Sequence, residues 1–404
     1  MNPARAGGRG PRRVVGELEQ TLVICALIGT AQMTWGVVVP VLPLYVDAFG
    51  IGVAVLGAIV SAFAVGRVVA NVPAGLALRR LPPRGYLSVV LLALAATTAA
   101  TGLAASVPAL LVARFVAGVL GGAAVTIAFS VLLAGADTAQ RGRVIAMATV
   151  VQMSAAAAGS VLGGIVLSVA DARTVFVVAA LPVLLALGWE RLRPATRYWA
   201  AFRADHEPSR PRFGRAGALL LLAGLGGVSF ATFFTRFAGE QGLVPVLAYD
   251  SGGLDPVGLG IALAAGTLAS LAIVPLVGRL VDAGARRSIL LPSAALAGVS
   301  LLALEWAHTP LVFGVLVVLY SASTSALNIV PGVVTAERFP PARVGGVVGF
   351  TRTVGDAGAA VGPLVVFGLA DVAGTLPALA LGGVVLFAAV LLLAAGVRRP
   401  GGVG

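Results

Sequence analysis

Two short segments, Gly75-Leu-Ala-Leu-Arg-Arg-Leu-Pro-Pro-Arg84 and Gly278-Arg-Leu-Val-Asp-Ala-Gly-Ala-Arg-Arg287, carry the pattern that decides the fold. Each follows an apolar stretch, begins with glycine and ends in arginine, and Gly278 lies 203 positions after Gly75. The same spacing relates Asp47 to Asp250, Leu56-Gly57 to Leu259-Gly260, and Gly159 to Gly362. One register held from residue 47 to residue 159 indicates an internal duplication in the same orientation.

Long apolar stretches surround these segments, six before a polar interval and six after it. They cover residues 21–46, 52–77, 86–106, 109–134, 144–168 and 174–190, and then 216–238, 256–277, 288–307, 310–331, 346–370 and 375–397. About 20 residues suffice for a helix to cross a bilayer, and unbroken rather than alternating apolar runs exclude a β-barrel. We expect an all-α integral membrane protein of twelve transmembrane helices. Its parts would be an N-terminal six-helix bundle (1–192), a cytoplasmic linker (193–215) and a C-terminal six-helix bundle (216–404).

The composition excludes the soluble classes of protein. Of the 404 residues, 59% are hydrophobic and 11% are charged, whereas soluble domains carry about 25% charged residues. A soluble enzyme, a secreted binding module and a disordered protein are therefore excluded. One cysteine, Cys25, and two histidines permit no intramolecular disulfide and make a zinc site implausible, so we expect neither a metal nor a cofactor.

The charge distribution predicts the topology. All 28 basic residues are arginine and the net charge is +12. With the N-terminus inside, 23 arginines fall in cytoplasmic segments and only Arg173 falls outside. The positive-inside rule then predicts a multi-pass protein of the plasma or inner membrane with both termini cytoplasmic. Anionic lipid headgroups, rather than nucleic acid, would account for the charge. The basic linker is either an amphipathic segment on the inner leaflet or a solvated connector.

These features resemble the major facilitator superfamily over the whole chain. The family's loop after the second span looks like G-x-x-x-D-R-x-G-R-R, and in the family its aspartate helps to latch the cytoplasmic gate. The first copy departs from it, because Arg79 stands at the aspartate position. The resemblance assigns gating to Gly75, Arg80 and Arg84 in the first copy, and to Gly278, Asp282, Arg286 and Arg287 in the second.

Two further motifs resemble those of drug:proton antiporters. Arg114-Phe-Val-Ala-Gly118 is similar to the family's R-x-x-x-G motif in span 4. Gly358-Ala-Ala-Val-Gly362-Pro363 resembles the exporter motif G-x-x-x-G-P, which usually lies in span 5, where this chain has Gly159-Ser160. The resemblance implies a twelve-span multidrug-type exporter. Glycines four residues apart have a second interpretation, which is close helix packing.

Four arginines fall within predicted spans, namely Arg67, Arg114, Arg236 and Arg352. Each would cost about 2.5–3.5 kcal/mol at the bilayer centre, so each needs a partner or a wet cavity. Arg352 and Asp356 are four residues apart and could form a salt bridge on one helical face. We predict proton coupling by Asp356, Arg352 and Arg114, with a permanent salt bridge between Arg352 and Asp356 as the alternative. Glu240 and Glu305 are expected at span ends, near the membrane interface.

In the family the central cavity is lined by spans 1, 4, 7 and 10 and closed by spans 2, 5, 8 and 11. Carried onto this chain, the resemblance implies substrate binding by Gln32, Trp35, Phe129, Gln152, Phe230, Arg236, Tyr320 and Asn328. The excess of arginine over carboxylates in the spans favours neutral or anionic ligands over cations.

The sequence therefore predicts a secondary transporter that exports small organic compounds by alternating access, coupled to proton influx. Its partners would be a small-molecule substrate, protons and membrane lipids, and the protein would be monomeric. The N-terminal half lacks an acid deep in a span, which leaves a facilitated uniporter or an importer as the alternative. A non-transporting receptor or scaffold on the same fold is the alternative from another class. A chain without lysine has no phosphate-binding P-loop, which argues against an enzyme and an ATP-driven pump.

Overall fold

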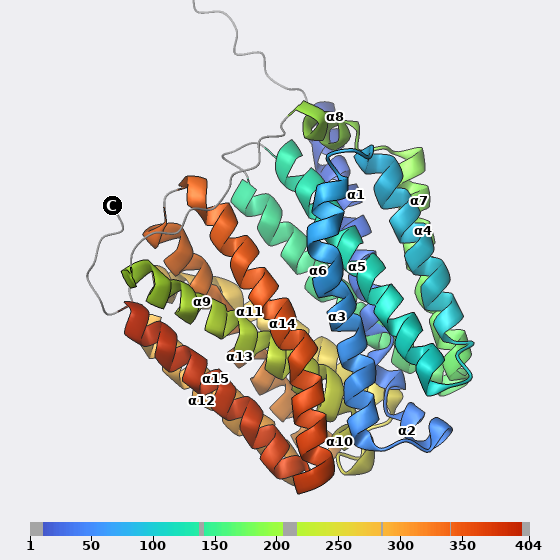
Figure 1. Ribbon diagram of the computed structural model, residues 1–404, viewed down its shortest axis with the longest axis vertical. Coiled ribbons are helices and arrows are strands. Elements are labelled where there is room, and N and C mark those ends of the chain that lie inside the picture. Colours follow the sequence, from blue (N-terminus) through green and yellow to red (C-terminus); the bar gives the residue numbers. More distant parts are fainter. Residues whose placement is uncertain (1–10, 137–140, 205–215, 284–285, 340, 398–404) are drawn as a thin grey trace, which may run out of the picture.

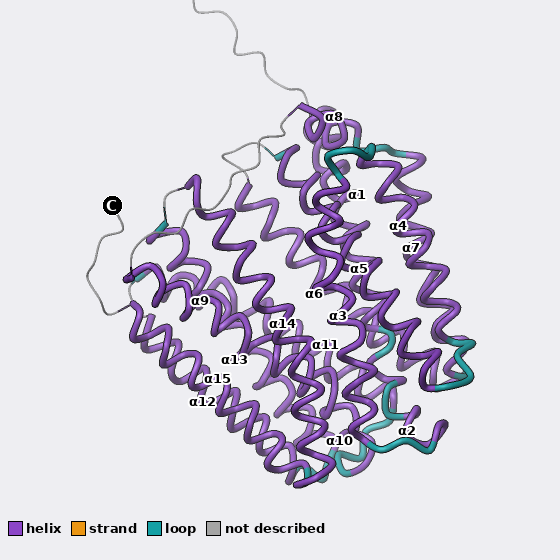
Figure 2. Tube along the Cα trace, in the orientation of Figure 1, coloured by secondary structure: helices purple, strands orange, loops and turns teal. Residues whose placement is uncertain are grey.

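The computed structural model describes residues 11–136, 141–204, 216–283, 286–339 and 341–397. Twelve helical stretches in these residues are long and apolar enough to cross a membrane. The regular secondary structure of the described residues is helical throughout (Figure 2). This confirms the expected all-α architecture of twelve transmembrane helices.

The elements fall into two groups joined by a short helix. The first group comprises α1 (Pro11–Gly36), η1 (Val39–Val41), α2 (Leu44–Phe49), α3 (Val53–Ala77), α4 (Pro83–Thr101), α5 (Val107–Gly135), α6 (Arg141–Val169) and α7 (Ala172–Leu192). The connecting helix is α8 (Thr196–Ala204). The second group comprises α9 (Ala216–Thr235), η3 (Arg236–Leu243), α10 (Val244–Asp250), α11 (Pro256–Asp282), α12 (Arg286–Ala303), η4 (Leu304–Trp306), α13 (Pro310–Arg338), α14 (Pro341–Ala373) and α15 (Thr375–Val397).

The duplication extends to helix caps and turns. Ser106 caps α5 by accepting a hydrogen bond from the Ala109 amide, and Thr309 caps α13 in the same way, with N···O distances of 3.4 Å in both. The turn residues Gly50 and Gly253 both have positive φ, 57° and 65°, which glycine adopts without a Cβ penalty. Each pair is 203 positions apart, so the two halves repeat their local structure as well as their order of spans.

Two pairs of helices join the halves, α3 with α14 and α6 with α11 (Figure 1). A Cβ atom at Gly57 would stand 2.6 Å from the carbonyl oxygen of Pro363, and one at Gly260 would stand 2.8 Å from that of Ser160. These two contacts are related by the same spacing of 203 residues. Glycine at both positions therefore lets the backbones of opposite halves touch at equivalent points.

The glycines of the exporter-like motif pack within one half. A Cβ atom at Gly358 would lie 2.3 Å from the carbonyl oxygen of Phe230, and one at Gly362 would lie 2.7 Å from that of Phe234. Both contacts join α14 to α9. The motif thus has a structural role in close helix packing, whatever its role in transport.

Contacts between the halves gather toward one face. We call the face formed by residues 50–52, 251–255 and 374 the arginine-poor face, and the opposite face, with residues 78–82, 193–195 and α8, the arginine-rich face (Figure 1). Near the arginine-poor face the Tyr249 hydroxyl donates to the Pro40 carbonyl at 2.8 Å. Toward the other face, a Cβ atom at Gly75, Gly278 or Gly349 would meet nothing within 4 Å. The contacts that join the halves therefore lie nearer the arginine-poor face, and the helices of the two halves diverge toward the arginine-rich face (Figure 1).

The start of the linker forms a helix that packs against the first half. Tyr198, Trp199 and Phe202 of α8 are buried against the first six spans. The Trp199 indole donates to Glu190 of α7 at 3.1 Å, and the Arg84 Nε atom donates to the same carboxylate at 2.9 Å. A 1% exposed carboxylate needs such partners, so one face of α8 packs against the first half, while Thr196 and Ala200 on the other face are exposed. Residues 205–215 lie outside the described residues.

We predict that Gly57→Val weakens closure at the arginine-poor face, because its side chain would clash with the Pro363 carbonyl. Cysteines introduced at Gly52 and Asp371, which face each other across the halves, should form less disulfide in this background. Gly368→Val is the matched control, because a Cβ atom there meets nothing within 4 Å. Equal cross-linking in both variants would contradict the role of Gly57.

Candidate functional site

Among the described residues, six arginine, aspartate and glutamate side chains lie away from the ends of the spans. They are Arg67, Arg114, Arg236, Arg352, Glu240 and Asp356. A charge inside the membrane is costly unless it has a partner or faces water, so the contacts of each side chain indicate its role. The contacts of Arg67, Arg352 and Asp356 cross from one half of the protein to the other, whereas those of Arg114, Arg236 and Glu240 stay within one half.

Asp356 joins α14 to α3. Its carboxylate lies 3.0 Å from the Arg67 Nη2 atom and accepts a hydrogen bond from Asn71 Nδ2 at 2.7 Å. Asn71 in turn accepts a hydrogen bond from the Thr126 hydroxyl of α5 at 3.2 Å. Only 1% of the Asp356 side chain is exposed. The result is a buried ion pair between the halves, and two successive hydrogen bonds connect it to α5.

This arrangement corrects the expected Arg352–Asp356 salt bridge, because the ion pair of Asp356 is with Arg67. The i, i+4 spacing reveals neighbours on one helix, whereas the actual partner stands on the facing helix. A signal was present in the sequence, since Arg67 and Asn71 are also four residues apart and so share one face of α3.

Arg352 instead contacts an aromatic ring of the other half. Its guanidinium carbon lies 5.2 Å from the centre of the Phe129 ring on α5. A cation over an aromatic face is attracted by the ring quadrupole. The attraction is about 0.5–1 kcal/mol at an exposed site and stronger where the pair is desolvated. The structure therefore brings together two residues that were predicted for different roles, proton coupling and substrate binding.

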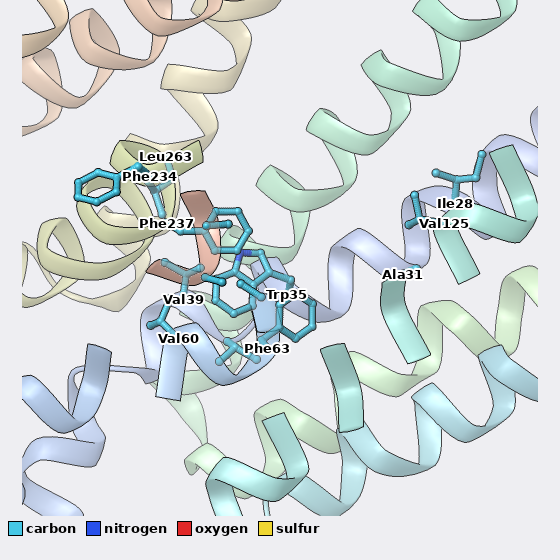
Figure 3. Close-up of a cluster of buried hydrophobic side chains, with 14 of the residues drawn as sticks. Ile28, Ala31, Trp35, Val39, Val60, Phe63, Val125, Phe234, Phe237 and Leu263 are labelled. Atoms are coloured by element: carbon cyan, nitrogen blue, oxygen red, sulfur yellow. The ribbon is translucent and has the colours of Figure 1, made fainter. Parts of the chain in front are cut away.

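Arg114 is enclosed by aromatic rings beside the interface. Its guanidinium carbon lies 4.6 Å from the centre of the Trp35 ring and 4.8 Å from that of Phe63. Its Nε and Nη2 atoms have no hydrogen-bond partner among the described residues. Trp35 also stacks on Phe237 (Figure 3). Its indole donates a hydrogen bond to the Gln241 side-chain oxygen of η3 at 2.5 Å. Trp35 thus links Arg114 to the second half.

The seventh span is longer than expected and changes its helix type. The span runs from Leu219 to Asp250, and its central segment η3 is a π-helix. The Val244 amide donates to the Gly239 carbonyl, five residues back, while Pro245 lacks the amide that an α-helix would direct to residue 241. Glu240 consequently lies inside the span rather than at its end as expected, whereas Glu305 in η4 lies at a span end.

A small cavity of about 20 Å³ opens beside η3, between the two halves. Arg236 and Glu240 both line it, with 4.0 Å between Arg236 Nε and Glu240 Oε2. The remaining lining comes from α1, η1 and α6 of one half and from η3 and α11 of the other: Gly36, Val39, Ala156, Ala157, Ser160, Gln241, Leu263 and Thr267.

The other residues predicted for substrate binding are scattered. Gln32, Gln152 and Phe230 are half-buried on α1, α6 and α9. Tyr320 lies on α13 and is 1% exposed, and its hydroxyl has no hydrogen-bond partner in the described structure. Asn328 is exposed, and its amide donates to the Thr324 carbonyl of its own helix at 3.0 Å.

The residues predicted for gating lie at the ends of helices toward the arginine-rich face. Gly75 and Gly278 have open space around their Cα atoms, and Arg80 is exposed. Arg84 is engaged with Glu190 within the first half. Asp282 ends α11 and Arg286 and Arg287 begin α12, but their side chains lie outside what the structure describes. Among the described residues, no group of three His, Cys, Asp or Glu side chains could hold a metal ion.

Comparison with known proteins matches this geometry to a known fold. The sequence profile of the Major Facilitator Superfamily matches residues 24–243 and 228–403. Among curated proteins, none matches the chain significantly.

Several solved structures share the fold. The human organic anion transporter MFSD10 (TETRAN) is 18% identical with a TM-score of 0.67, covering 93% of this chain and 99% of that one. A bacterial homolog to the human lysosomal transporter Spinster is 16% identical, covering 96% of both chains. Its TM-score is 0.69 in an inward-facing and occupied conformation and 0.64 in an inward-facing and unoccupied one. At these identities the likeness shows the fold alone.

We predict that Arg67→Gln lowers the thermal stability of the protein more than the double variant Arg67→Gln/Asp356→Asn does. The single change leaves a buried carboxylate without its cation, which typically costs about 3–5 kcal/mol, whereas removing both charges costs much less. The measurement is the melting temperature of purified protein at pH 8.

The control is Arg173→Gln, an exposed arginine outside the site, which should leave the melting temperature nearly unchanged. Additive effects of the two substitutions would mean that Arg67 and Asp356 are not energetically coupled.

Proposed function

Because the chain belongs to the major facilitator superfamily and is a secondary transporter, not an enzyme, we propose that it exports small organic compounds, neutral or anionic, in exchange for protons. The observation that carries this proposal is the charge of the membrane interior. Four arginines and two carboxylates lie away from the ends of the spans, so the interior carries a net positive charge. Such an interior attracts anions and repels lipophilic cations.

The proposed direction of transport, out of the cell, is supported by the membrane potential and by resemblance to known transporters. An anion that leaves a cell whose interior is negative gains about 2.3 kcal/mol per 100 mV of membrane potential. The chain resembles drug:proton antiporters in the Gly358–Pro363 motif, and it shares its fold with a human organic anion transporter. These points favour efflux of amphiphilic, multidrug-type compounds over uptake.

Asp356 is the proposed site of proton coupling, with Arg352 and Arg114 in supporting roles. When the halves separate along α3 and α14, the Arg67–Asp356 ion pair must break inside the membrane. Breaking a buried pair leaves two uncompensated charges, but a proton on Asp356 removes one of them. Protonation would therefore lower the cost of switching between conformations.

In this proposal the arginine-rich face is cytoplasmic, as the positive-inside rule expects. The conformation described above is then open to the cytoplasm and ready to receive an intracellular compound. The gating residues at the ends of α3, α4, α11 and α12 would meet when that face closes, and the protein would act as a monomer in the plasma or inner membrane.

The test is transport by purified protein in lipid vesicles, with an imposed proton gradient. Matched anionic, neutral and cationic aromatic compounds are offered on one side. Movement of the anionic or neutral compound against its gradient, driven by protons moving the other way, would support the proposal. Movement only down its own gradient would indicate a uniporter, co-movement with protons would indicate an importer, and no movement of any compound would favour a receptor or scaffold.

We further predict that Asp356→Asn abolishes the pH dependence of transport while the protein remains folded. Asparagine cannot take up a proton, yet it can still accept the hydrogen bond from Asn71. The measurement is the initial transport rate between pH 6 and pH 8, with elution volume and melting temperature as checks on folding. A folded Asp356→Asn protein whose pH profile equals that of the natural protein would rule out this coupling site.

A further inference from the structure

We propose that the cavity beside η3 holds the anionic group of a carboxylate-type ligand on Arg236, and that Glu240 occupies the same position when the ligand is absent. This inference rests on the proposed function, since it names where and how the anion is bound. Glu240 would act as an internal substitute for the ligand, displaced when the ligand enters.

The cavity lies where a transported compound must meet both halves. Its walls come from α1 and α6 on one side and from η3 and α11 on the other. The π-helix directs residues 236, 240 and 241 into this one cavity. Wide π-helical turns are rare and are often found at functional sites.

Arg236 has binding capacity that its present partner does not use. The Arg236–Glu240 contact is 4.0 Å, whereas Arg67–Asp356 is 3.0 Å and Arg84–Glu190 is 2.9 Å. The Arg236 Nε atom is buried and has no hydrogen-bond partner among the described residues. About 36% of its side chain is nevertheless accessible. A guanidinium in this state is loosely paired and reachable, and it offers the planar fork that matches a carboxylate.

The two hydroxyl groups in the cavity are already engaged. Ser160 donates to the Gly36 carbonyl at 3.1 Å, and Thr267 donates to the Leu263 carbonyl at 3.1 Å. The Gln241 side-chain oxygen accepts the Trp35 indole hydrogen bond. Among the residues that line the cavity, Arg236 is the one cation and Glu240 the one carboxylate, so the charge of an anionic group would be matched by Arg236.

The experiment measures binding of 4-phenylbutanoate, 4-phenylbutanol and 4-phenylbutylamine to purified protein by calorimetric titration. Arg236→Gln should raise the Kd of the carboxylate at least ~10-fold, which corresponds to ~1.4 kcal/mol, and leave that of the alcohol unchanged. Glu240→Gln should lower the Kd of the carboxylate by ~10-fold, because the ligand no longer competes with an internal carboxylate. Arg173→Gln serves as the control for loss of an arginine.

The opposite signs of the two effects separate this inference from a purely structural ion pair, in which both substitutions would weaken binding or change nothing. Carboxylate binding that survives Arg236→Gln and is lost in Arg352→Gln or Arg114→Gln would overturn the inference and leave the proposed function standing. If none of the proteins prefers the carboxylate to the amine, both the inference and the proposed substrate class fail.

Discussion

Where water does not reach it, a charge inside a membrane-spanning bundle has to be matched by protein groups, and this constraint shapes the interface between the halves. The Arg67–Asp356 ion pair, the Arg352–Phe129 contact and the Trp35–Gln241 hydrogen bond all cross from one half to the other. If either half moved alone, these groups would lose their partners. The interface is therefore held by pairings that are costly to break one at a time.

A second kind of contact fixes how closely the halves approach. At Gly57 and Gly260 the backbones of opposite halves touch without an intervening side chain. The two contacts are equivalent under the internal duplication, so the halves meet at a pair of similar close contacts. Backbone contact determines the distance between helices, and the polar pairs determine which charges face each other.

Much of the fold was predictable from sequence because its signals are local or periodic. Apolar runs predict the spans, and the spacing of 203 residues alone aligns Gly57 with Gly260. The candidate site was less predictable, because the partner of Asp356 lies on a helix 289 positions earlier in the chain. The position of Glu240 was missed for another reason, since a polar Gly-Glu-Gln-Gly run interrupts the apolar pattern, while the π-helix carries the span through it.

The docking of α8 has a mechanical consequence for motion between the halves. α8 ends at Ala204 and the next span begins at Ala216, so 11 residues of sequence connect the two bodies. A chain of that length spans at most roughly 40 Å. If α8 were not packed against the first half, residues 193–215 would permit a separation about twice as large. The packing of α8 thus limits how far the second half can move from the first.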